Sequence, residues 1–367
     1  MSRSAIAFDL HGIRVRLESQ LPELVEYARV ALEPHVVADA GAFDITSALE
    51  WVDGTPQREL TQAFSDGSWQ HRPDRDLYID GSRGFWLRID DFPDLQLAVT
   101  EEAGRIALRG RYHFYLARDA RGDRLRRLRH RNRMTELRGR RFSTLLYYLF
   151  YHPLLWMLSR RHGWHVLHGG GVATPAGAIV LAGMPGCGKS TLAVALLADP
   201  SCRMLSDNLV LHDGTRALAC PELLLLDENS RRMAGGGAAR LAATGERRVY
   251  ARDAHRIAQI ELEPQPIAAI FHVERARESR VQRIDATESA SRLRAANLMA
   301  KEVRRIAIMN EVLDAVACTR RTDEAGILLQ LAAQVPSYEL RVATLPELTR
   351  FAAEEILSRV QPEAVAS

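Results

Sequence analysis

The chain has 367 residues, 47% hydrophobic and 26% charged, which is typical of an ordinary folded protein with two domains or one large one. The net charge of +3 is too small to support nucleic-acid binding by the protein as a whole. No two of the four cysteines have C-x-x-C spacing, which excludes that kind of zinc or redox site and fits reduced thiols in the cytoplasm.

The first third of the chain contains many short strand-like segments. Residues 8–17 alternate like a strand with a turn near Gly12, and residues 22–32 have helical spacing with Pro22 in the first turn. We therefore predict a smaller, strand-rich α+β domain over residues 1–140. It has no catalytic motif, so substrate recruitment, dimerisation and scaffolding all stay open as its role. Further extended segments are predicted at 42–53, 76–79, 84–89, 95–100, 105–108 and 112–116.

Residues 118–141 are strongly basic. One interpretation is a strip that binds anions, either nucleic acid or an acidic partner. The other is a solvated linker or helix face between two domains. The stretch has no aromatic residue, which disfavours single-stranded nucleic acid as a partner. The dominant residues are Arg124, Arg126, Arg127, Arg129, Arg131, Arg133, Arg138, Arg140 and Arg141.

The longest apolar stretch is residues 142–158, which contain His152 and Pro153. This segment is too short and too interrupted for a membrane span, so we predict a buried helix and no membrane partner. The first residues after Met1 lack the apolar core of a signal peptide, and a cytoplasmic location is therefore expected.

The second predicted domain, residues 141–367, contains the most specific motif. Residues 183–190, Gly-Met-Pro-Gly-Cys-Gly-Lys-Ser, fit the phosphate-loop pattern G-x-x-x-x-G-K-[ST]. A β-hairpin is predicted before them, over residues 164–182, and a helix is predicted after them from Thr191. This order of strand, glycine-rich turn and helix N-terminus places the helix dipole against a phosphate.

Each fixed residue of this loop has a physical task. The glycines allow backbone N–H groups to approach an anion closely. Lys189 is one of only two lysines in an arginine-rich chain and can reach the β- and γ-phosphates as a point charge. The Ser190 hydroxyl can join the coordination shell of Mg²⁺. The predicted nucleotide-binding residues are Gly183, Gly186, Cys187, Gly188, Lys189, Ser190 and Thr191.

The remainder of the chain alternates between strands and helices. Residues 227–252 are rich in glycine and arginine and are predicted to form a loop. Strands are predicted at 202–205, 209–211, 221–226, 267–273, 279–284 and 337–342, and helices at 289–318, 325–333 and 345–360.

Two short motifs flank the phosphate loop. His168-Gly169 ends the first apolar run of the hairpin, and Asp207-Asn208 ends the next strand after the loop. Ligands of open α/β sheets bind at the carboxyl ends of strands, so Asp207 is a candidate general base for a hydroxyl that attacks the γ-phosphate. Alternatively, Asp207 only forms a turn or caps a helix, and His168 is only a half-buried histidine of a strand. The apolar run of an ordinary Walker B strand is short here, with only Met204-Leu205 before Ser206.

This ordered set resembles the kinase domain of the bacterial HPr kinase/phosphorylase family, and more closely the HPr-kinase-related proteins. The resemblance is based on three motifs within residues 160–215, namely His168-Gly169, residues 183–190 and Asp207-Asn208. The resemblance implies an α/β P-loop kinase domain with a mixed sheet related to phosphoenolpyruvate carboxykinase. It also implies ATP and Mg²⁺ as cofactors, a serine of a protein or peptide as acceptor, and homo-oligomers.

By the same resemblance, Asp207 is the general base and His168 orients or tunes it, with Ser190 and Asp207 near the metal. The chain departs from the family pattern at Asn208, where a second carboxylate is expected, so the reverse phosphorolysis is in doubt. A P-loop ATPase or GTPase switch, a non-catalytic nucleotide-binding module and a small-molecule acceptor stay open. Further candidates for metal or phosphate contacts are Glu222, Arg231, Arg232, Arg247 and Arg248.

Overall fold

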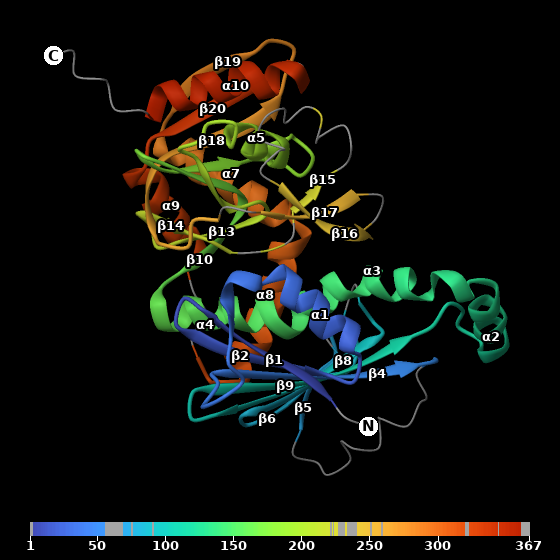
Figure 1. Cartoon of the computed structure of the whole chain (residues 1–367). Coiled ribbons are helices and arrows are strands. Elements are labelled where there is room, and N and C mark those ends of the chain that lie inside the picture. The colour runs from blue at the N-terminus through green and yellow to red at the C-terminus, as the bar shows by residue number, and fades with distance from the viewer. Residues whose placement is uncertain are drawn as a thin grey trace. The chain divides into compact units, whose positions relative to one another are not determined.

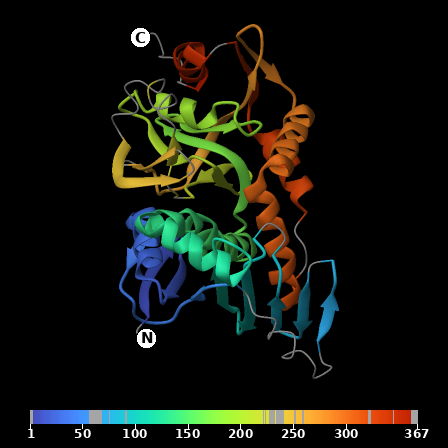
Figure 2. The same ribbon diagram turned by 90° about the vertical axis from the view of Figure 1, so that its right-hand side faces the viewer.

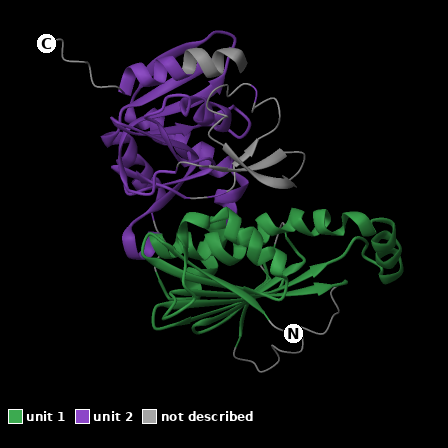
Figure 3. Cartoon of the chain, in the orientation of Figure 1, with its two compact units in different colours: residues 1–158, 306–321 green, residues 159–305, 322–367 purple. Residues whose placement is uncertain are grey.

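The protein is a mixed α/β chain that divides into two compact units (Figure 3). Unit 1 comprises Met1–Leu158 and Ile306–Arg321, and unit 2 comprises Ser159–Arg305 and Thr322–Ser367. Residues 141–158, which the sequence analysis assigned to the second domain, thus belong to unit 1. The computed structural model describes residues 3–55, 69–74, 76–89, 92–220, 222, 224–226, 232, 241–249, 252–257, 260–319, 323–343 and 345–360, with backbone alone for 224–226, 241–249, 252–257 and 345–352.

Unit 1 is built on a nine-stranded mixed sheet in the order β3-β1-β2-β4-β9-β8-β7-β6-β5 (Figure 1). The β2–β4 and β4–β9 pairs are parallel and the others are antiparallel. The strands are β1 (Ser4–Leu10), β2 (Ile13–Ser19), β3 (Val36–Val37), β4 (Ile45–Asp53), β5 (Gln70–Arg72), β6 (Leu77–Asp80), β7 (Arg83–Trp86), β8 (Leu95–Glu102) and β9 (Arg105–Phe114).

Gly110 does not end a strand, although residues 105–108 and 112–116 were predicted as two strands. It lies inside the continuous strand β9, and a Cβ added there would lie 3.1 Å from both Leu149 and Leu49. The glycine therefore allows a helix to pack closely on this face of the sheet.

Helices cover one face of this sheet (Figures 1 and 2). Residues 142–158 are helical and buried, which confirms the prediction, but a π-helical turn interrupts them. The Ser47 hydroxyl donates to the Leu149 carbonyl of that turn. The helical elements are α1 (Pro22–Ala31), η1 (Glu33–His35), α2 (Ala120–Arg129), η3 (Arg131–Arg133), α3 (Met134–Leu146), η4 (Tyr147–Tyr151) and α4 (His152–His162).

Unit 2 contains an eight-stranded mixed sheet, in the order β11-β10-β13-β14-β18-β20-β19, with β12 added on β10. β11 also pairs with β18, and the β11–β18 and β18–β20 pairs are parallel. The strands are β10 (His165–Thr174), β11 (Gly177–Ala182), β12 (Arg203–Ser206), β13 (Leu209–His212), β14 (Arg216–Leu218), β18 (Gln265–Arg275), β19 (Arg280–Ile284) and β20 (Ser337–Val342).

A three-stranded sheet in the order β15-β17-β16 also belongs to unit 2. Its strands are β15 (Leu224–Leu226), β16 (Leu241–Val249) and β17 (Arg252–Ile257). The prediction of a loop over 227–252 is therefore wrong for β16. A run of polar residues and a glycine in β16, Thr-Gly-Glu-Arg-Arg, hid its strand character from a search for apolar runs.

Helices pack on both faces of the eight-stranded sheet. One core joins α5 and α10 to residues such as Leu181 and Phe271, and the other joins α7 and α9 to residues such as Val180 and Ile270. The helix predicted over 289–318 breaks at Ala300, where ψ is 121°. Within the described residues, no helix has both the length and the apolar character needed to cross a bilayer. The helices of unit 2 are α5 (Lys189–Leu196), α7 (Ala286–Met299), α9 (Glu324–Gln334) and α10 (Leu345–Val360). The helix α8 (Lys301–Val316) begins in unit 2 and belongs to unit 1 from Ile306 onward.

Candidate nucleotide-binding site

The phosphate loop connects the end of β11 to the start of α5, as the motif predicted. β11 lies between β10 and β18, so the loop leaves from inside the sheet. Gly183 has φ +144°, and an added Cβ would lie 2.5 Å from the Val273 carbonyl oxygen. Gly188 caps α5 with φ +106°. Other residues would be strained at both positions, so the glycines serve the path of the loop.

Lys189 lies inside the loop. It is 6% exposed, and its Nζ donates to the carbonyl oxygens of Gly183 at 2.8 Å and Met184 at 3.0 Å. Burial lowers the pKa of Lys189, while Cys187 and Asp207 oppose that effect. An ammonium group beside a helix N-terminus favours an anionic ligand such as a phosphate.

The neighbouring loop residues differ in exposure. Gly186, at the crest, is exposed, Ser190 is half-buried, and Thr191 is buried. Cys187 is buried, with its Sγ 4.0 Å from Lys189 Nζ. The hydroxyl of Ser190 is thus more accessible to a metal than that of Thr191.

The turn that carries Asp207 lies beside β10, the strand that carries His168. Ser206, the last residue of β12, pairs with Gly171, and Leu209, the first of β13, pairs with His168. Asp207 and Asn208 therefore lie opposite Gly170 and Gly169. The Gly169 N–H donates to the Asn208 carbonyl at 3.1 Å, which fixes this turn against β10.

Electrostatics connect these residues to the phosphate loop. His168 is 5% exposed, and burial, together with the charge of Lys189, lowers its pKa to about 4 against an opposing effect of the Asn208 backbone. The negative charge of Asp207 in turn acts to raise the pKa of Lys189. Lys189, His168 and Asp207 thus belong to one site, in which His168 is neutral at physiological pH.

Asn297 supports this site, although the sequence did not reveal it. Its Oδ1 accepts a hydrogen bond from the His168 N–H at 2.8 Å, and its Nδ2 donates to the Val166 carbonyl at 3.4 Å. Asn297 lies on α7, 129 residues beyond His168. No local pattern marks such a contact, because only the packing of α7 on β10 creates it.

The structure describes only two of the remaining candidate side chains, those of Glu222 and Arg232. Arg231 lies outside the described residues, as do the side chains of Arg247 and Arg248. Arg232 is exposed. Glu222 is half-buried and acts to raise the pKa of Cys220, after the larger effect of burial.

Ser190 and Asp207 have the oxygen donors that Mg²⁺ prefers. Among the side chains that the structure describes, no three of the types His, Cys, Asp and Glu form a cluster suited to a metal. Phosphate-linked Mg²⁺ needs no such cluster, since one or two carboxylates, waters and phosphate oxygens complete its shell. The donor set therefore fits Mg²⁺ that arrives with a nucleotide.

Comparison with known proteins adds no family. The chain matches no protein-family model, and no curated protein has a matching sequence. The functional argument therefore depends on the motif and on the residues that gather around it.

Proposed function

We propose that the protein is an ATP-dependent kinase that transfers the γ-phosphate to a hydroxyl group, with a serine of a protein or peptide as the preferred acceptor. The observation that supports this most strongly is that His168 and Asp207 both interact electrostatically with Lys189 of the phosphate loop. A phosphate loop alone serves many nucleotide-binding proteins, whereas a carboxylate beside its lysine can also accept a proton from an attacking hydroxyl.

Nucleotide binding would depend on the backbone of residues 183–188 and on Lys189. Their N–H groups and ammonium would surround the β- and γ-phosphates. Ser190 and Asp207 would hold Mg²⁺, which neutralises negative charge on those phosphates when it is bound. Lys189 would exchange its bonds to the carbonyls of Gly183 and Met184 for bonds to phosphate.

The transfer step would use Asp207 as the base. The acceptor hydroxyl oxygen forms a bond to the γ-phosphorus, the bond from that phosphorus to the β,γ-bridging oxygen breaks, and ADP leaves. The hydroxyl proton moves to the Asp207 carboxylate. His168, neutral because its pKa is about 4, would position the turn that carries Asp207 without adding positive charge.

The resemblance to HPr kinase/phosphorylase stays a prediction from short motifs. The neutral side chain of Asn208 leaves one carboxylate at the turn, which suits the forward reaction better than a reversible one. It also keeps a switch that only hydrolyses or binds nucleotide as the competing function.

The first test uses Asp207→Asn, with Asp199→Asn as a matched control in the turn after α5. Each variant is incubated with γ-labelled ATP, Mg²⁺ and lysate of the source cell. We expect Asp207→Asn to keep its affinity for ATP and to slow transfer by about 10²–10⁴-fold, the usual contribution of a general base. Transfer at the wild-type rate by this variant would overturn the base assignment, and release of free phosphate alone would favour an ATPase.

The second test compares the two lysines of the chain. Lys189→Ala should weaken ATP binding by at least about a hundredfold and abolish transfer, because several charge-assisted hydrogen bonds are lost. Lys301→Ala, at an exposed position, should leave both unchanged. Isothermal titration calorimetry measures the affinity, and equal affinities for the two variants would argue against the phosphate site.

A further inference from the structure

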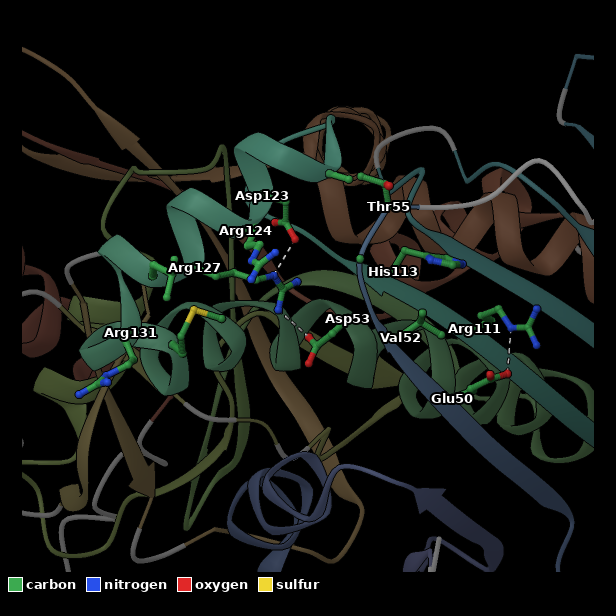
Figure 4. A pocket seen from close by; sticks show the side chains of 14 residues that line it. Glu50, Val52, Asp53, Thr55, Arg111, His113, Asp123, Arg124, Arg127 and Arg131 are labelled. Carbon is green, nitrogen blue, oxygen red and sulfur yellow. Dashed lines mark hydrogen bonds and ion pairs between the residues drawn. The ribbon is translucent and has the colours of Figure 1, made fainter.

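Unit 1 contains an open groove of about 990 Å³ that the predicted phosphate site does not use. Figure 4 shows its two walls. Arg124, Arg127 and Arg131 extend from α2 and the turn after it, while Glu50, Asp53, Arg111 and His113 come from the ends of β4 and β9. One wall of the groove therefore belongs to the basic stretch for which the sequence offered two interpretations.

One face of α2 forms a wall of the groove. Ala120, Asp123, Arg124, Arg127 and Leu128 line it, and they recur at the interval that places side chains on one helix face. Arg121, Leu125 and Arg129 belong to α2 but do not line the groove.

The carboxylates of the groove are already occupied. Arg127 Nε bonds to Asp123 at 2.6 Å, and its Nη1 lies 3.2 Å from Asp53. Burial works to raise the pKa of Asp123, but hydrogen bonds from the Leu116 N–H and Arg127 outweigh it and lower that pKa. Arg111 Nε bonds to Glu50 at 2.8 Å. None of these three carboxylates therefore needs a cationic ligand.

Two arginines are left for a ligand. Arg124 and Arg131 are exposed, and the guanidinium group of neither has a hydrogen bond or ion pair within the described parts of the chain. Burial, with some effect of Arg111, lowers the pKa of His113, so this imidazole is mainly neutral near pH 7. The available charge in the groove is thus positive and comes from two guanidinium groups on one wall.

The groove also offers apolar contacts and an open strand edge. Val52, Leu128 and Met134 line it, and Leu128 is 65% exposed. β2 ends opposite Leu49, so in the described structure the last residues of β4 pair with β9 alone. Such an edge can accept an extended peptide, and alternate side chains of that peptide can reach charged and apolar neighbours.

We propose that this groove binds an acidic polypeptide segment that also carries apolar side chains. Its carboxylates would pair with Arg124 and Arg131, and an apolar side chain would cover Leu128. A nucleic acid fits less well, because no Phe, Tyr or Trp is among the described residues that line the groove, so bases have no stacking partner there. This binding is a property of unit 1 and does not depend on phosphoryl transfer.

Fluorescence anisotropy tests the proposal with the full-length protein. The probe is a fluorescein-labelled peptide about twelve residues long, rich in glutamate with interspersed leucines. The variant Arg124→Glu/Arg131→Glu reverses the two available charges. The matched control, Arg121→Glu/Arg129→Glu, makes the same change in net charge at exposed positions on α2 outside the groove. Circular dichroism melting establishes that both variants are folded.

We expect saturable binding that weakens with added salt, at least about tenfold weaker binding by Arg124→Glu/Arg131→Glu, and a change below about twofold for the control. The same peptide with glutamine in place of glutamate should not bind. Equal losses in the two variants, no saturable binding by the wild type, or tighter binding of a labelled single-stranded oligonucleotide through Arg124 and Arg131 would overturn the proposal.

Discussion

The two units bury their sheets in different ways. In unit 1, β2 alternates between buried and half-buried residues along Ile13–Ser19, the pattern of a sheet with one covered face. In unit 2, every residue of β11 and β13 is buried, the pattern of strands covered on both faces. The cores differ accordingly, since all buried aromatic residues of the described chain except Trp164 and Phe271 belong to unit 1.

This difference decides where each unit can bind a ligand. A sheet covered on both faces leaves its strand ends accessible, and there unit 2 presents backbone groups, one lysine and one carboxylate. A sheet with one covered face can use side chains beside its strands, and there unit 1 presents guanidinium groups. The proposed phosphate site therefore depends on glycines and close strand packing, whereas the proposed peptide site depends on exposed charge.

The largest expected effect tests burial on both faces. Ile270 and Phe271 are neighbours in β18 that belong to opposite cores, and both are fully buried. Ile270→Ala should cost about 2–5 kcal/mol of unfolding free energy and Phe271→Ala about 3–5 kcal/mol. In β2, Leu17→Ala should cost about 2–5 kcal/mol, while Arg16→Ala should cost less than about 1 kcal/mol.

Urea denaturation of the four variants measures these losses. A small loss for either Ile270→Ala or Phe271→Ala would mean that one face of the unit 2 sheet is not a packed core. A loss for Arg16→Ala as large as that for Leu17→Ala would contradict the open face of unit 1.

Acid should affect unit 2 more than unit 1. Burial is the largest cause that lowers the pKa of His168 and His272 to about 4 and that of His212 to about 3. In unit 1, the pKa of His35 is about 4 and burial also lowers the pKa of His113, while in unit 2 burial lowers the pKa of His165 as well. Because these values lie below the ordinary value near 6.5, the unfolded chain binds more protons. Stability should therefore fall as the pH drops from about 6.5 toward 4, by about 1.4 kcal/mol per pH unit for each histidine.

Two spectroscopic signals separate the units in this experiment. Every tryptophan except Trp164 lies in unit 1, so the fluorescence of a Trp164→Phe variant reports unit 1 alone, whereas far-ultraviolet circular dichroism reports both units. As the pH falls to about 5, the dichroism melting temperature should decrease more than the fluorescence melting temperature. Equal decreases would contradict the unequal distribution of buried histidines.

The sequence predicted unit 2 best where local chemistry decides the structure. An apolar run bounded by a turn identified β11, residues 337–342 were predicted as a strand and form β20, and Pro346 with helical spacing identified α10. The glycines, Lys189 and Ser190 identified the phosphate loop, because its conformation and charge demand those residue types.

The prediction failed where contacts between residues far apart in the sequence determine the structure. Gly110 indicated a strand break but serves close helix packing, and Ala300 breaks a helix without any glycine or proline signal. Asn297 joins the site only because α7 packs beside β10. The basic stretch was visible, but its division into paired arginines and the available Arg124 and Arg131 depends on carboxylates from β4.

The smallest expected effect compares two helix caps. Asp119 accepts a hydrogen bond from the Gly122 N–H at 2.6 Å at the start of α2, and Asp285 accepts one from the Glu288 N–H at 2.9 Å at the start of α7. Replacing either aspartate by alanine should cost its helix about 1 kcal/mol. Of the residues in α2 only Asp123 is buried, whereas α7 buries several residues, including Leu293.

The same local cost should therefore have different consequences. Asp285→Ala should lower the global unfolding free energy by about 1 kcal/mol, because α7 is packed into a core and opens only with unit 2. Asp119→Ala should leave global stability unchanged and speed amide hydrogen exchange in α2 about fivefold, because α2 opens locally. The same substitution should also lower the affinity for the acidic peptide, while the affinity for ATP stays constant. A global loss in Asp119→Ala equal to that in Asp285→Ala would show that α2 is an integral part of the unit 1 core and that the groove wall is rigid.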